Sequence, residues 1–115
     1  GTTYGGNPFA TAAVEAVLNI YEKENILDNV NTVGKYLEEQ LDNLVKECDN
    51  VLERRGKGMM QGLVLKNPVG EVITKAIEKG LLVISAGGNV LRMLPPLIIT
   101  KENVDEMINI LRTCL

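Results

Sequence analysis

Residues 80–99, GLLVISAGGNVLRMLPPLII, decide the fold because they predict a β-hairpin inside a mainly helical chain. Short apolar runs at residues 81–85 and 90–94 flank the turn at residues 86–89, whose glycines permit the chain to reverse. Pro95 and Pro96 end the second strand, because proline has no backbone N–H to donate. This stretch therefore predicts a sheet that is mainly antiparallel.

Two more strands are predicted before this hairpin. Residues 51–58 and 59–65 combine short apolar runs with Gly56, Gly58 and Gly62, a pattern typical of two strands joined by a turn or bulge. We interpret Met59 and Met60 as core residues, because methionine fills irregular gaps between apolar side chains.

The first helix is predicted at residues 8–24. Asn7 is a favoured N-cap, and Pro8 is preset for the first helical position. Apolar residues lie on nearly every side of this helix, so an isolated domain would leave it poorly covered. We therefore expect a missing partner surface.

A long amphipathic helix is predicted at residues 26–46. Its apolar residues recur every three or four positions, at Leu27, Val30, Val33, Leu37, Leu41 and Leu44. The opposite face is charged, and we interpret it as a solvated surface. It carries Asp28, Lys35, Glu38, Glu39, Asp42 and Lys46.

Two further helices complete the prediction. Asn67 and Pro68 repeat the helix-opening pair, and Gly80 supplies the C-terminal stop. Thr100 is placed to cap the last helix, with Glu102 near its positive end. The sequence thus predicts an α+β two-layer domain, with a mainly antiparallel sheet covered on one face by helices.

Length and composition are those of one folded domain. The 115 residues are 45% hydrophobic and 23% charged, with a net charge of −3. No apolar run approaches the roughly 20 residues that cross a bilayer, and the start lacks a signal peptide, so we expect a cytoplasmic protein without a membrane partner. The only basic cluster, Arg54, Arg55 and Lys57, is interpreted as a solubilising surface, so nucleic acid is not an expected partner.

Metal and cysteine chemistry are not predicted. The chain has no histidine, and Cys48 and Cys114 lack CxxC spacing, so neither a zinc site nor a Cys–His nucleophile can form. Both cysteines are expected to be reduced. No catalytic residue is predicted within this chain.

The N-terminal loop is the first candidate site. Residues 1–7, GTTYGGN, combine hydroxyls and glycines with a following helix N-terminus, which favours binding of an anion such as phosphate. The loop lacks the P-loop pattern, and similar loops are often only turns and caps. The sequence does not decide between an anion-binding loop and a loop that is only a turn and a helix cap.

Arg92 is the second candidate, as the only charge in the apolar run at residues 90–97. A guanidinium in a buried strand needs an anionic partner, and its fork geometry suits a carboxylate. The sequence does not separate an internal Asp or Glu from a substrate carboxylate.

The chain resembles class III aminotransferases. Residues 1–10, GTTYGGNPFA, resemble the segment that joins the large and small domains of that family. Residues 80–99 are similar to the arginine-bearing segment of the acetylornithine aminotransferases, and the RGKG stretch at residues 55–58 resembles another part of the same domain. The resemblance implies the C-terminal small domain of a fold type I enzyme that uses pyridoxal 5'-phosphate, with residues 1–7 as the interdomain and cofactor loop.

The same resemblance implies roles for three residues. Thr3 corresponds to the hydroxyl residue that binds the cofactor phosphate, which is held mainly by the other subunit of a homodimer. Thr2 corresponds to a position associated with the amino-acid substrate. Arg92 corresponds to the arginine that binds the substrate α-carboxylate.

The implied activity is transfer of an amino group from N-acetylornithine to 2-oxoglutarate in arginine biosynthesis. The family's Schiff-base lysine lies upstream of the Gly-Thr-Thr segment, and the chain opens on Gly1 without an initiator Met. We therefore expect the large domain to be missing and these residues alone to be inactive. The alternatives are the small domain of an ornithine, succinylornithine or 4-aminobutyrate aminotransferase, or a noncatalytic α+β interaction module.

Overall fold

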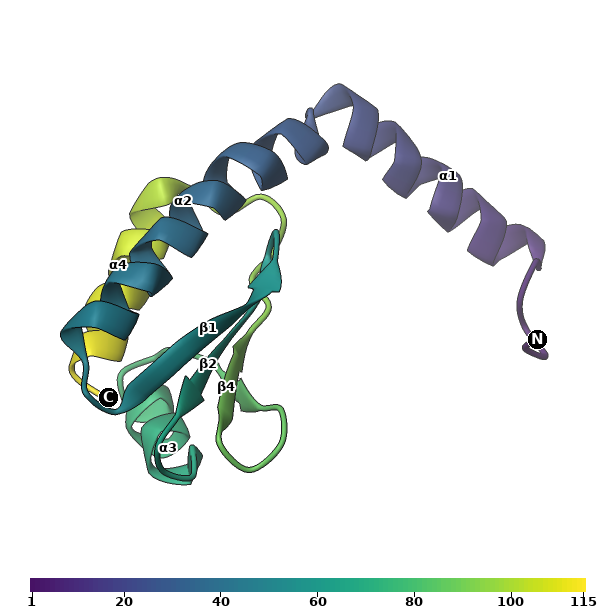
Figure 1. Cartoon of the computed structure of the whole chain (residues 1–115). Helices are drawn as coiled ribbons and strands as arrows, with labels where there is room; N and C mark the ends of the chain where they lie inside the picture. The colour runs from purple at the N-terminus through teal and green to yellow at the C-terminus, as the bar shows by residue number, and fades with distance from the viewer.

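A computed structural model describes all 115 residues and contains four helices and four strands (Figure 1). In chain order they are α1 (Pro8–Lys23), α2 (Ile26–Glu47), β1 (Val51–Lys57), β2 (Met60–Leu65), α3 (Gly70–Glu78), β3 (Ile84–Ser85), β4 (Val90–Met93) and α4 (Lys101–Arg112). The four predicted helices and the two predicted pairs of strands are all present.

The four strands form one sheet in the order β1-β2-β4-β3, and every neighbouring pair is antiparallel. The first strand of the predicted hairpin is shorter than expected, because it contains only Ile84 and Ser85. Gly80, with a φ of 82°, ends α3, and the Leu81 N–H donates to the carbonyl of Ala76 as in a Schellman cap. The Leu81 N–H therefore pairs with the end of α3 and not with a strand of the sheet.

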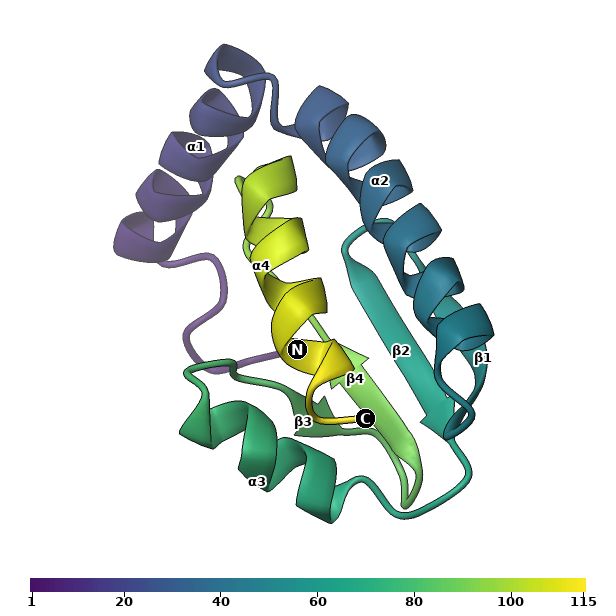
Figure 2. The ribbon, with the colours of Figure 1, turned by 90° about the vertical axis from the view of Figure 1, so that its left-hand side faces the viewer.

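Helices α2, α3 and α4 all lie on one side of the sheet, as Figure 2 shows. They share one core of 18 buried residues with the inward-facing residues of β2 and β4. Its fully buried members include Leu37, Leu41 and Leu44 of α2, and Leu63 and Leu91 of the sheet. The predicted two-layer α+β architecture is confirmed, and the other face of the sheet carries no helix.

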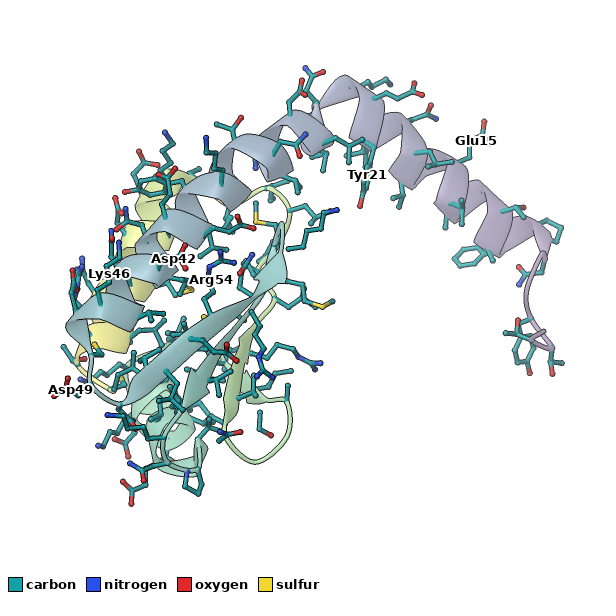
Figure 3. The ribbon with its side chains drawn as sticks, viewed as in Figure 1. Glu15, Tyr21, Asp42, Lys46, Asp49 and Arg54 are labelled. Carbon is teal, nitrogen blue, oxygen red and sulfur yellow. The ribbon has the colours of Figure 1, made fainter.

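A polar network joins α2 to the sheet, so part of the charged face of α2 is not the solvated surface we predicted. Arg54 Nε donates to Asp42 Oδ1 at 2.7 Å, and Arg54 Nη1 donates to Gln61 Oε1 at 3.1 Å. The amide of the buried Gln61 donates to the Gly58 carbonyl and to Glu38. Figure 3 shows Asp42 and Arg54 pointing toward one another between α2 and β1.

The predicted start of α3 was wrong by two residues, whereas the predicted cap of α4 is confirmed. Helix α3 begins at Gly70, and its N-cap Val69 offers no side-chain acceptor. The Asn67 amide instead donates to Oδ1 of Asn50, which lies in the loop between α2 and β1. Thr100 and Asn103 form a complete capping box at the start of α4.

Helix α1 projects away from the rest of the domain (Figure 1). It has no buried residue, which confirms the expectation that this helix is poorly covered. Asn25 turns the chain between α1 and α2 in the left-handed conformation, which asparagine tolerates better than most residues. The molecule consequently measures 50 × 31 × 24 Å along its principal axes. No helix is both long enough and apolar enough to span a bilayer.

Candidate functional site

The face of the sheet that lacks helices carries Arg92. In the strand register Arg92 of β4 lies opposite Gly62 of β2, and Gly62 lies opposite Arg55 of β1. Residues directly opposite in antiparallel strands place their side chains on the same face. Arg55, Gly62 and Arg92 therefore form one row across the open face.

This row lies in a depression of about 580 Å³. Its lining contains three cations and no acidic residue, and consists of Arg55, Gly56, Lys57, Met60, Gln61, Gly62, Ala86, Val90 and Arg92. Met60 is 55% exposed here, so its predicted place in the core was wrong, whereas Met59 is buried as expected. The depression combines positive charge with an apolar rim, which suits a small organic anion.

Arg92 is half-buried and has no internal partner. It forms none of the ion pairs of the chain, and its Nε is the only buried side-chain nitrogen or oxygen without a hydrogen bond. A buried donor left unpaired costs about 1–3 kcal/mol. The structure thus excludes the internal Asp or Glu partner that the sequence left open, and the guanidinium is available to an acceptor from outside the chain.

The basic cluster of β1 divides between the two faces of the sheet. Arg54 turns toward α2, where its hydrogen bond to Asp42 raises the pKa of the guanidinium, so the interpretation as a solubilising surface was wrong for this residue. Arg55 and Lys57 line the depression beside Arg92. The period-two alternation of β1 is the sequence signal that separates Arg55 and Lys57 from Arg54.

The N-terminal loop is a turn and a helix cap that leaves the Thr3 hydroxyl free. Asn7 Oδ1 accepts from the Ala10 N–H at 3.0 Å, which confirms the predicted N-cap, and Thr2 Oγ1 accepts from the Gly5 N–H at 2.8 Å. The exposed Thr3 hydroxyl takes part in none of the hydrogen bonds of the loop. A free hydroxyl in a loop that leads into a helix can donate to a phosphate group.

The structure does not bring Thr2 and Thr3 together with Arg92. The two threonines lie at the far end of α1, whose 16 residues span about 24 Å, and α1 leads away from the sheet (Figure 1). This separation is compatible with the role implied for Thr3, because that role concerns a phosphate held mainly by another subunit.

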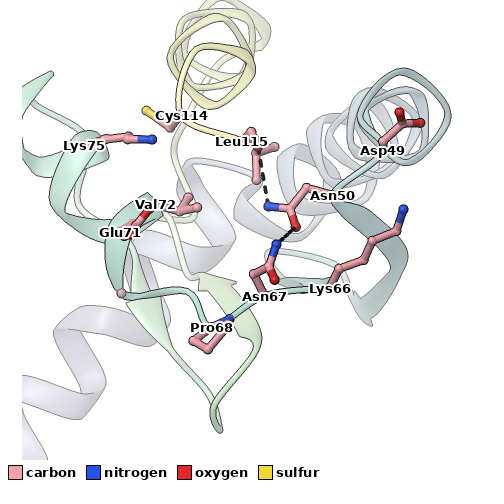
Figure 4. Close-up of a pocket in the computed structure, with 11 residues that line it drawn as sticks. Asp49, Asn50, Lys66, Asn67, Pro68, Glu71, Val72, Lys75, Cys114 and Leu115 are labelled. Atoms are coloured by element: carbon pink, nitrogen blue, oxygen red, sulfur yellow. Dashed lines mark hydrogen bonds between the residues drawn. The ribbon is translucent and has the colours of Figure 1, made fainter.

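A larger cavity, of about 800 Å³, lies between α3 and the C-terminus (Figure 4). Asn50 donates to the Leu115 carbonyl and accepts from the Asn67 amide, so these polar groups already pair with one another. Lys66 and Lys75 are balanced there by Asp49 and Glu71. None of the predicted site residues lines this cavity, and the open face of the sheet remains the candidate site.

Comparison with known proteins places the whole chain, residues 1–115, in one family, described as aminotransferase class-III. The chain is 48% identical over 111 residues to an acetylornithine aminotransferase from Caldanaerobacter subterraneus subsp. tengcongensis, which covers 96% of this chain and 28% of that protein. It is 42% identical over 112 residues to a LysW-aminoadipate semialdehyde/glutamate semialdehyde transaminase from Sulfolobus acidocaldarius, which covers 97% of this chain and 29% of that protein.

Solved structures agree with the sequence relatives. A lysine aminotransferase from M. tuberculosis superimposes with a TM-score of 0.91 at 29% identity, over 99% of this chain and 27% of that one. The chain thus spans less than a third of the length of each of these three proteins. With its whole length matched and its fold reproduced, this chain belongs to the class-III aminotransferase family.

Proposed function

We propose that this chain is the C-terminal small domain of an acetylornithine aminotransferase that depends on pyridoxal 5'-phosphate. The complete enzyme would transfer the amino group of N-acetylornithine to 2-oxoglutarate in arginine biosynthesis, as a cytoplasmic homodimer. The name of the Caldanaerobacter relative supports this choice. The observation that carries it is the buried Nε of Arg92, which has no acceptor within the chain and faces an acid-free depression.

Each site residue has a defined task in this proposal. The fork of Arg92 binds and orients the substrate α-carboxylate through paired N–H donors. Thr3 donates its free hydroxyl to the cofactor phosphate of the opposite subunit, and Thr2 borders the amino-acid substrate bound in that same opposite site. When bound, the cofactor supplies the electron sink that amino-group transfer requires. The large domain, the proposed source of the cofactor-binding lysine, and the second subunit are the partners of this chain.

Substitution of Arg92 in the complete enzyme tests the proposal. Arg92→Gln removes the charged fork, so we expect kcat/KM for N-acetylornithine to fall on the order of 100-fold, equivalent to about 3 kcal/mol. Arg112→Gln is the matched control, because Arg112 pairs with Glu47 on the helical face and should leave kcat/KM unchanged. An Arg92→Gln enzyme with the kinetics of its parent would remove Arg92 from the site.

The amino donor is tested with the same preparation. N-acetylornithine, ornithine, succinylornithine and 4-aminobutyrate are compared by kcat/KM with 2-oxoglutarate as acceptor, and N-acetylornithine is expected to rank first. The Sulfolobus relative, named for aminoadipate semialdehyde and glutamate semialdehyde, gives a specific alternative, in which the amino group is exchanged with the aldehyde carbon of such a semialdehyde. A higher kcat/KM with one of the other donors would reassign the substrate and keep the aminotransferase function.

A further inference from the structure

Asn29 of α2 is hydrogen-bonded to the segment that follows the strand of Arg92. Its side-chain amide donates to the Leu97 carbonyl at 2.8 Å and to the Ile99 carbonyl at 3.1 Å, across 68 and 70 residues of sequence. We propose that Asn29 is a positioning residue, which holds this segment so that Arg92 meets the substrate carboxylate in the productive orientation. The inference rests on the proposed function, because Asn29 acts through Arg92.

Residues 94–99 connect β4 to α4 and form few hydrogen bonds of their own. Of the backbone hydrogen bonds outside helices and strands, one involves this segment, from the Ile99 N–H to the Pro96 carbonyl. The segment passes beside the N-terminal turns of α2 (Figure 1), where Asn29 donates to it twice. Asn29 is therefore the side chain through which hydrogen bonds tie the segment to another element.

The chain between this anchor and β4 is stiff. Pro95 and Pro96 each have a φ restricted to about −65°, and a residue that precedes a proline is restricted as well. Residues 94–96 consequently have little freedom to absorb a displacement. A shift of Leu97 is passed along the chain to Arg92, near the end of β4.

Arg92 depends on this anchor because no group of the chain orients its guanidinium. Its Nε has no hydrogen bond, and its side chain forms none of the ion pairs. The strand register places its main chain opposite Gly62 on one side and Ile84 on the other, and the side chain follows the main chain. A misplacement of about 1 Å can cost up to about 100-fold in rate, so a small shift of β4 is enough to matter.

The test uses the complete, cofactor-loaded enzyme with the substitution Asn29→Asp. Aspartate has the shape of asparagine, but its carboxylate offers no donor to the two carbonyls. Negative charge near the N-terminus of α2 favours that helix, so a loss of activity would not come from a weakened helix. We expect kcat/KM for N-acetylornithine to fall about tenfold.

Asn31→Asp is the matched control. Asn31 lies exposed two residues further along α2 and takes no part in the hydrogen bonds to residues 94–99. The substitution introduces the same charge without removing this contact, so kcat/KM should not change. Asn29→Ser is a second variant, which offers one donor in place of two, and it should give a smaller loss. It carries the test if circular dichroism shows that Asn29→Asp does not fold.

A double-mutant cycle with Arg92→Gln separates positioning from stability. If Asn29 acts through Arg92, the double variant should have the kcat/KM of Arg92→Gln alone, because there is no longer a guanidinium to position. A general loss of stability would instead lower kcat/KM further. The cofactor dissociation constant of Asn29→Asp should equal that of the parent, since residues 94–99 do not hold the N-terminal loop.

The outcomes separate the two proposals. If the Asn29 variants keep the kcat/KM of the parent while Arg92→Gln lowers it, the role of Asn29 is overturned and the proposed function stands. Independent losses in the double variant, or an equal loss in Asn31→Asp, would overturn that role as well. If Arg92→Gln itself has the kinetics of its parent, the proposed task of Arg92 fails, and the task of Asn29 fails with it.

Discussion

Arg92 and Thr3 both carry a polar group that forms no hydrogen bond within the chain. Arg92 has a buried Nε without an acceptor, and Thr3 has an exposed hydroxyl outside the hydrogen bonds of its loop. Neither arrangement favours the stability of this chain, since a buried unpaired donor costs free energy and an exposed hydroxyl contributes almost none. Such groups are expected where a site is completed by another molecule or another part of the protein.

The role of Thr3 is tested by its removal. In the complete enzyme Thr3→Ala deletes the proposed hydroxyl donor to the cofactor phosphate, so we expect the cofactor dissociation constant to rise about fivefold to tenfold. The midpoint of thermal unfolding of the cofactor-free protein should not change. Thr11→Ala is the control, because the Thr11 hydroxyl donates to the Pro8 carbonyl within α1. Equal cofactor affinity in both variants would contradict the role of Thr3.

Tyr36 makes the free energy of unfolding of the chain depend on pH in the alkaline range. Its hydroxyl donates to Asp105 Oδ1 at 2.6 Å, and this hydrogen bond is the main cause that raises the tyrosine pKa above 10.0. Because the pKa is raised in the folded state, the contribution of Tyr36 is complete below pH 10 and is lost as the pH rises through the raised pKa. We therefore expect Tyr36→Phe to be less stable than the parent at neutral pH, with a difference that disappears in strong alkali.

Urea unfolding of parent and Tyr36→Phe at a series of pH values measures this difference. Tyr21→Phe is the control, because Tyr21 forms none of the side-chain hydrogen bonds of the chain and lies on α1 (Figure 3). A stability difference for Tyr36→Phe that stays constant up to pH 12 would show that the hydrogen bond to Asp105 is not its source.

At the scale of elements, the contact between α2 and the β1-β2 ribbon depends on Arg54. Its side chain is 19% exposed and serves both Asp42 and the buried Gln61. Arg54→Ala removes all three of these hydrogen bonds, two to Asp42 and one to Gln61, and leaves Gln61 Oε1 without a donor, so we expect a loss of about 1–3 kcal/mol in the free energy of unfolding. Arg112→Ala breaks an exposed pair instead and should cost less than about 1 kcal/mol.

A double-mutant cycle of Arg54 with Asp42 isolates their interaction from the loss of packing. The two single variants and the double variant are compared by urea unfolding, and their coupling energy is expected to be favourable. Additive losses would mean that the ion pair contributes nothing and that Arg54 stabilises the domain through Gln61 and its aliphatic stem alone.

The elements that local signals define were predicted well. Thr100 caps α4 through Asn103, three residues along the chain, and Gly80 ends α3 through its own positive φ. The start of α3 was missed because Asn67 lies outside the helix, where its side-chain NH2 donates to Asn50, 17 residues away in sequence. The side of the sheet on which Arg54 lies was missed as well, because a register shift between Val51 and Glu53 and the position of α2 decide it together.

The sequence identified Arg92 as a candidate site residue, but it did not predict which residues surround it. Arg92 stood out as a single charge in an apolar run, and its lack of an internal partner became visible only in the folded chain. Its neighbours Arg55 and Met60 come from strands 30 residues or more away in sequence, so no local pattern connects them with it. The distance between Thr3 and Arg92 depends on how Asn25 directs α1 away from α2, which a sequence pattern does not specify.

At the scale of the whole molecule, α1 is the part that the chain does not stabilise by itself. Phe9 is 87% exposed, and Val14, Val17, Leu18 and Ile20 are each at least 50% exposed. An isolated helix of this length is marginal in water, because most helix stability in proteins comes from packing of an apolar face. The proposed large domain and second subunit would supply that packing.

Hydrogen exchange can compare α1 in the 115-residue chain and in the complete enzyme. In the chain alone we expect the amides of α1 to exchange through local opening, orders of magnitude faster than those of Leu63 and Leu91 in the fully buried core. In the complete enzyme α1 should be protected, because its apolar faces are covered. Helix α2 is the internal control, since it already packs on the sheet and should be protected in both samples. Equal protection of α1 and α2 in the 115-residue chain would mean that α1 needs no partner surface.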